Sequence, residues 1–174
     1  IPAKTASLPA ARRVARGPAG SFYVAAATSG SAAARIVKID GEEVLTTVWT
    51  GAAGSQVRGI AVGPEGSLYF SDTGAHRVYR ILPGTSTPLP FAGSGGNGSS
   101  GDGGLATSAL LSSPQGLAVA PDGSVYIADT GNSRIRRVDV EGKIWKITGN
   151  GYCNSWKTSA ECGDGGPATS AALG

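Results

Sequence analysis

One segment of the chain occurs twice almost unchanged. Residues 59–74 read GIAVGPEGSLYFSDTG, residues 116–131 read GLAVAPDGSVYIADTG, and a weaker third copy runs from Arg13 to Ala25. Repetition at a spacing of a few tens of residues is typical of solenoids and propellers, in which each repeat packs only against its neighbours. The repeat therefore constrains the fold more than any other feature of the sequence.

A second element repeats in the connections between these segments. Residues 101–111 read GDGGLATSALL, residues 163–173 read GDGGPATSAAL, and the opening PAKTASL aligns with the second half of the latter. We expect one partial domain, 1–174, with repeats at about 9–57, 58–113 and 114–174 and with linker elements at 1–8 and 164–174. Because both ends fall at the same phase of the repeat, we expect the chain to be cut from a longer protein.

Each repeat contains the signals of four short strands. In the third repeat these are residues 116–120, 124–128, 134–140 and 143–148, separated by glycine-containing turns such as Pro121-Asp-Gly123. The first two strands are almost continuously apolar, which indicates that both faces of each sheet are covered. An abundance of glycine (28 residues) with 10 prolines fits many tight turns. The pattern predicts an all-β chain of four-stranded propeller blades, joined by a short helical turn at each ATSAL segment.

The third repeat resembles the NHL-repeat family of β-propellers. The residues that carry the resemblance are Pro114, Gly116, Val119, Gly123, Tyr126, Asp129, Asn132, Arg134 and Ile135. The second repeat has Ala75 in place of the asparagine, and the GDGG linkers are similar to those of bacterial secreted NHL proteins and of teneurin- and Rhs-like proteins. The resemblance implies antiparallel blades in an incomplete ring, because NHL rings close with about six blades. The remaining blades would come from the parent protein, or from self-association through the open end blades.

The net charge of +3 is too small to indicate a nucleic-acid-binding protein. Tripartite-motif NHL proteins bind RNA through a positive face, so the resemblance leaves an RNA-binding face as an alternative. The basic residues that would form it are Arg12, Arg13, Arg16, Arg58, Arg134, Arg136, Arg137, Lys143 and Lys146. No aromatic residues alternate with these arginines to stack bases, which argues against that alternative. No apolar run is long enough to cross a bilayer.

A loop with two cysteines distinguishes the last repeat. Cys153 and Cys162 flank an insertion that the second repeat lacks. A disulfide between them would close the loop and would imply an oxidising compartment; two free thiols in a cytosolic protein are the alternative. Trp156, with Tyr152 and Lys157, would suit contact with a protein or carbohydrate partner.

Two aspartate–arginine pairs recur at the same place in successive repeats. Asp72 precedes Arg77 by the same interval as Asp129 precedes Arg134. Recurrence favours a structural role, in which the carboxylate accepts turn amides and the arginine pairs with it across the hairpin; calcium ligands or acid/base groups are the alternative.

Three further features receive structural interpretations. We interpret Asp102 and Asp164 as structural, although a GDGG nest offers amides to an ion. The only histidine, His76, is expected to face solvent in its turn. The glycine-rich residues 93–101 are expected to form a flexible loop.

The sequence therefore predicts no catalytic residue, no cofactor and no metal ligand in this chain. The expected function is that of a non-catalytic scaffold, extracellular or at the cell surface of a bacterium, whose loops contact a protein or glycan. The alternative is part of a six-bladed enzyme resembling amidating lyases or esterases, with the catalytic residues in other blades. Fold-level analogy alone does not separate these functions.

Overall fold

Three four-stranded antiparallel sheets make up the computed structural model, which describes residues 2–5, 8, 10–26, 33–150 and 166–172. Blade 1 contains β1 (Ala11–Arg16), β2 (Phe22–Ala26), β3 (Arg35–Ile39) and β4 (Leu45–Thr50). Blade 2 contains β5 (Val57–Val62), β6 (Leu68–Asp72), β7 (Arg77–Ile81) and β8 (Leu89–Ala92). Blade 3 contains β9 (Leu117–Val119), β10 (Val125–Asp129), β11 (Arg134–Val138) and β12 (Ile144–Thr148).

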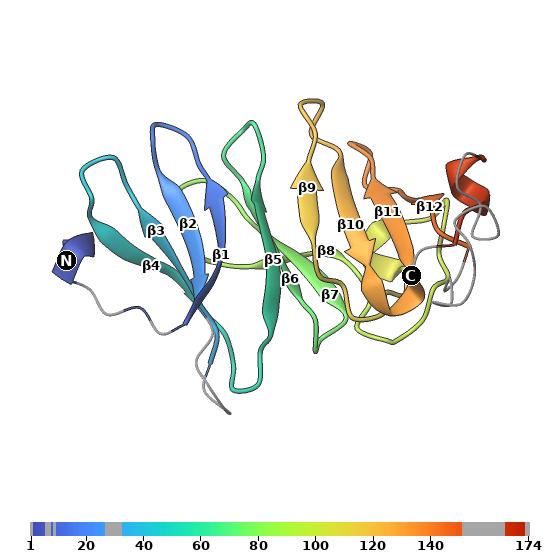
Figure 1. The fold of residues 1–174 in the computed structure, drawn as a ribbon, viewed down its shortest axis with the longest axis horizontal. Helices are drawn as coiled ribbons and strands as arrows, with labels where there is room; N and C mark the ends of the chain where they lie inside the picture. Colours follow the sequence, from blue (N-terminus) through green and yellow to red (C-terminus); the bar gives the residue numbers. More distant parts are fainter. Residues whose placement is uncertain (1, 6–7, 9, 27–32, 151–165, 173–174) are drawn as a thin grey trace.

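The blades stand side by side, with their first strands adjacent. Strand β5 lies beside both β1 and β9, and each sheet then continues away from this line in chain order, as Figure 1 shows. The described residues thus form consecutive propeller blades that do not close a ring, which confirms the predicted all-β propeller class. No described helix is long and apolar enough to cross a membrane.

The hairpin turns form for the reasons that the sequence indicates. In the turn between β9 and β10, the amide of Gly123 donates to the carbonyl of Ala120 at 2.9 Å with a φ of +88°, which favours glycine. The carboxylate of Asp122 accepts the amide of Ser124 at 2.9 Å and so closes the same turn.

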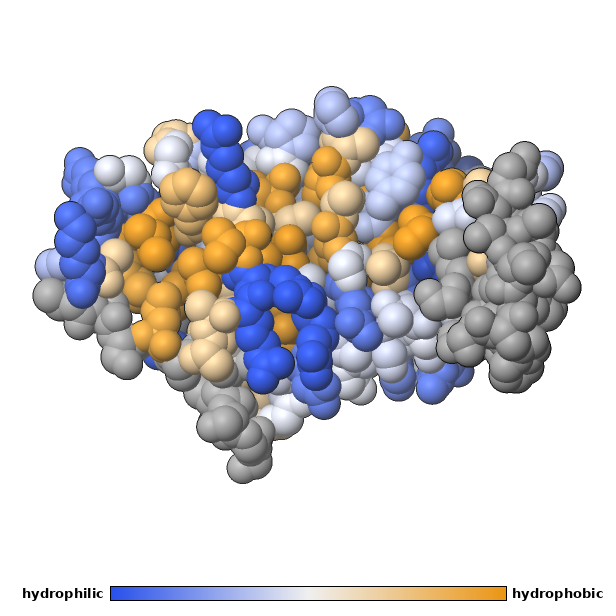
Figure 2. Space-filling model, viewed as in Figure 1, coloured by the Kyte–Doolittle hydropathy of each residue, from blue (hydrophilic) through white to orange (hydrophobic). Residues whose placement is uncertain are grey.

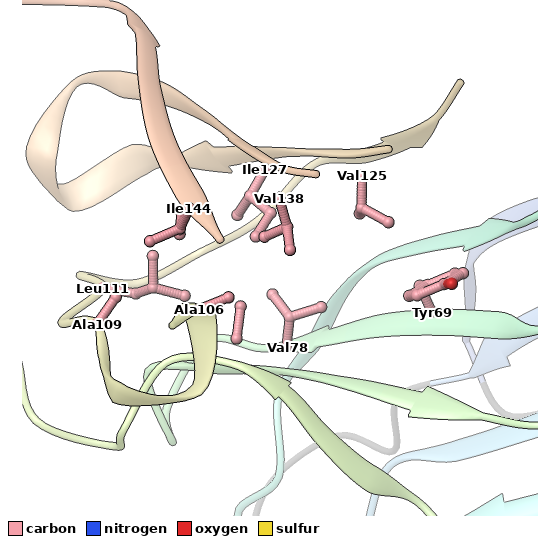
Figure 3. Close-up of a cluster of buried hydrophobic side chains, with 10 residues drawn as sticks. Tyr69, Val78, Ala106, Ala109, Leu111, Val125, Ile127, Val138 and Ile144 are labelled. Carbon is pink, nitrogen blue, oxygen red and sulfur yellow. The ribbon is translucent and has the colours of Figure 1, made fainter. Parts of the chain in front are cut away.

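The core between blades 2 and 3 includes part of the linker that joins them. The linker forms the 3₁₀ turn η2 (Ala106–Ser108). Ala106 of this turn, and Ala109 and Leu111 after it, lie among buried side chains of β7, β10, β11 and β12 (Figure 3). Equivalent turns, η1 (Ala3–Thr5) and η4 (Ala168–Ser170), occur in the other copies of this linker. The predicted helical turn at each ATSAL segment is confirmed, as a 3₁₀ turn.

The first strands of blades 2 and 3 approach closely enough to require a glycine. A Cβ added to Gly59 would lie 1.9 Å from the carbonyl oxygen of Gln115. The hydroxyl of Ser71 donates to that same carbonyl at 2.7 Å, and the hydroxyl of Thr73 donates to the carbonyl of Pro114 at 2.8 Å. Two side-chain hydrogen bonds therefore join β6 of one blade to the start of the next.

The face formed by the first strands is largely apolar. Figure 2 shows a hydrophobic band across the middle of the view, over β1, β2, β5 and β9. Val14 of β1 is 65% exposed, and Leu117 and Val119 of β9 are half-buried. Covering this band would release water from apolar surface, as further blades of a ring would do.

Candidate functional site

The aspartate that ends the second strand of a blade holds the chain segment just before that blade. Asp129 is fully buried at the end of β10, and its Oδ1 accepts the amide of Ser112 at 2.7 Å. Its Oδ2 accepts the side-chain amide of Asn132 at 2.7 Å. In blade 2, Asp72 Oδ1 accepts the amide of Gln56 at 3.0 Å. Both carboxylates accept a backbone amide of the incoming connection, and Asp129 also accepts the side-chain amide of Asn132 in its own turn.

Arg136 of β11 is fully buried and fastens the linker to blade 3. Its Nε and Nη2 both donate to Asp102 Oδ1, at 3.1 and 2.9 Å, and its Nη1 donates to the carbonyl of Leu110 at 2.7 Å. The carboxylate of Asp129 lies 3.9 Å from the same guanidinium. Asp102 therefore has a structural role as a partner of Arg136, and the inclusion of Arg136 in a basic surface is wrong because its side chain has no exposed surface.

The arginines predicted to pair with the turn aspartates have other partners. Arg77 lies opposite Asp72 in the β6–β7 register, and Arg134 lies opposite Asp129, but their guanidinium groups donate to the carbonyls of Ser94 and Ser99. These carbonyls belong to the glycine-rich loop. Neither arginine forms an ion pair with its aspartate across the hairpin, because its guanidinium donates to a backbone carbonyl of this loop instead.

The glycine-rich residues 93–101 are held in place rather than flexible. Besides the two arginines above, the side-chain amide of Asn132 donates to the carbonyl of Gly98 at 2.7 Å, and Arg136 donates to the carbonyl of Ser100 at 3.3 Å. The loop has no large apolar side chain to pack in the core, so hydrogen-bond donors of the neighbouring blades hold it in place.

His76 also connects two blades. Its Nδ1 accepts the amide of Ser113 at 3.0 Å, and its backbone has a φ of +52°. The residue is half-buried, so the expectation of a solvent-facing histidine is wrong. The hydrogen bond adds a contact between the β6–β7 turn and the entry to blade 3.

An open groove of about 660 Å³ lies between blades 1 and 2. Its floor is Phe70, which is fully buried, and its walls include Trp49 of β4 and Tyr79 of β7. The rings of Trp49 and Tyr79 lie 4.6 and 5.3 Å from that of Phe70, centroid to centroid. Asp72, Pro88 and the connection 52–56 also line the groove.

The groove lies where the linker packs in the next blade. Phe70 pairs with Tyr79 in blade 2 as Ile127 pairs with Arg136 in blade 3, and Ile127 is fully covered by the packing around η2. The long connection 93–116 fills that space, whereas blades 1 and 2 are joined by the short connection 51–56. The short connection thus leaves a groove beside the half-buried rings of Trp49 and Tyr79, above the buried Phe70.

Known proteins match part of the chain in sequence. The family model of the teneurin NHL domain matches residues 89–159. Teneurin-1 of Homo sapiens is 36% identical over 93 residues, which are 47% of this chain and 3% of that protein. The protein SUPPRESSOR OF QUENCHING 1, chloroplastic, of Arabidopsis thaliana is 34% identical over 82 residues, 47% of this chain and 8% of that protein.

These matches support an NHL-repeat family assignment. The expected likeness to the teneurin type of NHL domain is confirmed for the last blade and its linkers. Because the chain spans less than a tenth of the length of these relatives, what the whole proteins do does not transfer to it directly.

Solved structures share the fold of this NHL segment across different functions. An auxiliary nutrient binding protein from Bacteroides ovatus has a TM-score of 0.62 at 21% identity, over 83% of this chain and 37% of that one. Virginiamycin B lyase from Staphylococcus aureus has a TM-score of 0.55 at 18% identity, over 84% of this chain and 42% of that one. A binding protein and a lyase with the same fold show that the blades alone do not decide between the two functions.

Several predicted residues lie outside the part of the NHL segment that the structure describes. These are Tyr152, Cys153, Trp156, Lys157, Cys162 and Asp164, so the disulfide and the contact loop remain predictions. Within the described residues there is no group of three or more histidine, cysteine, aspartate or glutamate side chains placed to hold a metal ion.

The contribution of Asp129 to the free energy of unfolding should fall as the pH rises through its raised pKa. Burial raises the pKa of Asp129 above 3.8, against the lowering effect of its hydrogen bonds and of Arg136. The folded state therefore binds this proton more tightly than the unfolded state, and the stabilisation present below pH 3.8 is lost as the pH passes the raised pKa. Urea unfolding of the wild type and Asp129→Asn across this range measures the difference, which should shrink with rising pH. A growing difference would contradict the assigned direction.

Proposed function

We propose that this NHL segment is part of a non-catalytic extracellular scaffold that presents its loops to a protein or glycan partner. The proposal rests on one observation: the polar side chains best suited to catalysis form hydrogen bonds within the structure. Asp72, Asp129, His76 and Arg136 each bond to the connection that joins neighbouring blades. Because these side chains connect the blades, we expect a partner to be bound by the loops and by the surfaces between blades.

An oxidising location is part of the proposal, together with a bacterial source. The disulfide between Cys153 and Cys162 would form in the secreted protein. In mass spectrometry of the protein isolated under thiol-blocking conditions, the peptide with both cysteines should carry no blocking group and should gain two hydrogens on reduction. A peptide blocked at both thiols would instead indicate a reducing compartment and would count against secretion.

The scaffold is distinguished from an enzyme by testing the full-length parent for partner binding and for turnover. Trp156→Ala should weaken binding to cell-surface or matrix partners by tenfold or more, as is common for a central aromatic contact. Trp145→Ala removes an indole that is 42% exposed on β12 and serves as the matched control. Sustained turnover of lactone or ester substrates by the parent, with no partner bound, would overturn the proposal.

A further inference from the structure

Asp72 lacks the partners that its counterpart has in blade 3. Asp129 Oδ2 accepts a hydrogen bond from Asn132 and faces Arg136 at 3.9 Å. In blade 2, Ala75 and Tyr79 occupy the matching positions, and neither can supply a charged donor or an amide. Asp72 Oδ1 accepts the amide of Gln56, so the second oxygen of a carboxylate that is 7% exposed is available to a donor from outside.

The surroundings of that carboxylate favour a cation. Asp72 is the only charged residue among the described residues that line the groove, and the rings of Trp49 and Tyr79 line the same groove. Aromatic faces attract guanidinium groups, and a carboxylate accepts two parallel hydrogen bonds from one. Arg136 shows the same chemistry within this chain. It occupies the position in β11 that Tyr79 occupies in β7, and its guanidinium faces Asp129 and bonds to Asp102.

Blade 3 also shows what kind of molecule covers such a surface. The space over Ile127 and Ile144 is filled by the chain's own linker, whose 3₁₀ turn η2 and the residues after it place Ala106, Ala109 and Leu111 there. The matching space in blade 2, beside Trp49, Tyr79 and Pro88, has only the short connection 51–56 and remains open as the groove. A peptide segment is therefore the occupant that this surface is shaped to take.

We propose that the groove between blades 1 and 2 binds a peptide segment of a partner protein through an arginine, whose guanidinium bonds to Asp72 while its stem lies between Trp49 and Tyr79. The partner's small apolar residues then pack against Pro88 and the exposed parts of these two rings, which are half-buried in the free chain. This rests on the proposed scaffold function and names the site and the ligand chemistry within it.

The test uses the whole chain with a synthetic peptide, acetyl-Ala-Ala-Arg-Ala-Ala-amide, and the same peptide with citrulline, an uncharged isostere. Binding is followed in ¹⁵N NMR spectra, in which the Trp49 indole reports on the groove and the Trp145 indole serves as the internal reference. We expect the Trp49 signal to shift with the arginine peptide, and the citrulline peptide to bind at least about tenfold more weakly, since a hydrogen bond to a charged group contributes that much affinity.

Two variants with a matched control locate the site. Asp72→Asn keeps the Oδ1 acceptor for Gln56 and should weaken arginine binding by about tenfold or more. Tyr79→Arg installs the blade 3 residue beside Asp72 and should abolish binding by occupying the carboxylate. Glu42→Gln removes one negative charge from the exposed turn before β4 and should leave the affinity unchanged.

Each contrary outcome is decisive. Equal binding of the arginine and citrulline peptides, a wild-type affinity in Asp72→Asn, or shifts confined to residues outside the groove would overturn the assignment. So would a response of Trp49 to oligosaccharides or to a second copy of the chain but not to the arginine peptide. The citrulline comparison needs no variant, so it stands even if Tyr79→Arg fails to fold. If the parent binds its partner and Asp72→Asn has no effect on that binding, the scaffold proposal survives and the groove assignment does not.

Discussion

Arg136→Met is expected to lower the free energy of unfolding by about 3–5 kcal/mol, the usual cost of removing one partner from a buried ionic cluster. The substitution removes the cation that forms an ion pair with the buried Asp129, and it releases Asp102 and the carbonyls of Leu110 and Ser100 from their common donor. The methionine side chain fills much of the same space, so the loss reports on charge and hydrogen bonding rather than on a cavity. Chemical unfolding of both proteins measures it.

The matched control for this prediction is Arg58→Met, which changes an exposed arginine on β5 and should shift stability by no more than about 0.5 kcal/mol. Amide hydrogen exchange should accelerate in residues 98–111 of the Arg136 variant, because the linker loses its main attachment to blade 3. If Arg136→Met and Arg58→Met were equally stable, the buried cluster would contribute nothing to holding the linker.

Gly59→Ala is expected to destabilise the protein by at least about 2 kcal/mol, whereas Gly116→Ala should change stability by less than about 0.5 kcal/mol. The two glycines occupy the same position of the repeat. The new Cβ at position 59 would lie 1.9 Å from the carbonyl oxygen of Gln115, whereas at position 116 the nearest atom is the Cβ of Ala128 at 3.6 Å, an ordinary contact.

Relief of that overlap requires β5 and the entry to β9 to move apart. The movement would also break the hydrogen bond from Ser71 to Gln115, so the cost includes an unpaired buried hydroxyl. Thermal unfolding of the two variants beside the wild type is sufficient to compare them. Equal melting temperatures for the two alanine variants would show that the blades are not in contact at this point.

The sequence predicted the architecture because the blade's local signals agree with one another. Turn residues such as Pro121 and Gly123, apolar strands, and the recurring linker all indicate the same unit, and the strands begin and end within a few residues of their predicted limits. The first strand of blade 3 is shorter than predicted, at Leu117–Val119, because the backbone groups of Gln115 and Gly116 both bond to Ala128, which interrupts the regular pairing with β10.

Side-chain partners between blades were not predictable in the same way. Arg136 sits in a run, RIRRV, that reads as an alternating strand at the rim, and nothing local shows that Asp102, distant in sequence, lies against it. His76 and the glycine-rich loop were misjudged for the same reason, since their hydrogen bonds cross from one repeat to the next. The groove depends on a comparison of linker lengths, and the short connection 51–56 beside the aromatic residues was the signal that could have revealed it.

The attachment of the linker by Arg136 defines which piece of this protein can be exchanged as a whole. A cut at 113/114, where the sequence repeat places its boundary, separates Asp102 from the arginine that it accompanies. A module that runs from Gly93 to Thr148 keeps both, along with the carbonyls that Arg134 and Asn132 contact. Gene duplications or engineered shuffling of these blades should therefore succeed when the breakpoint precedes the linker. Each transferred blade then keeps the linker that Arg136 binds and that packs against the preceding blade.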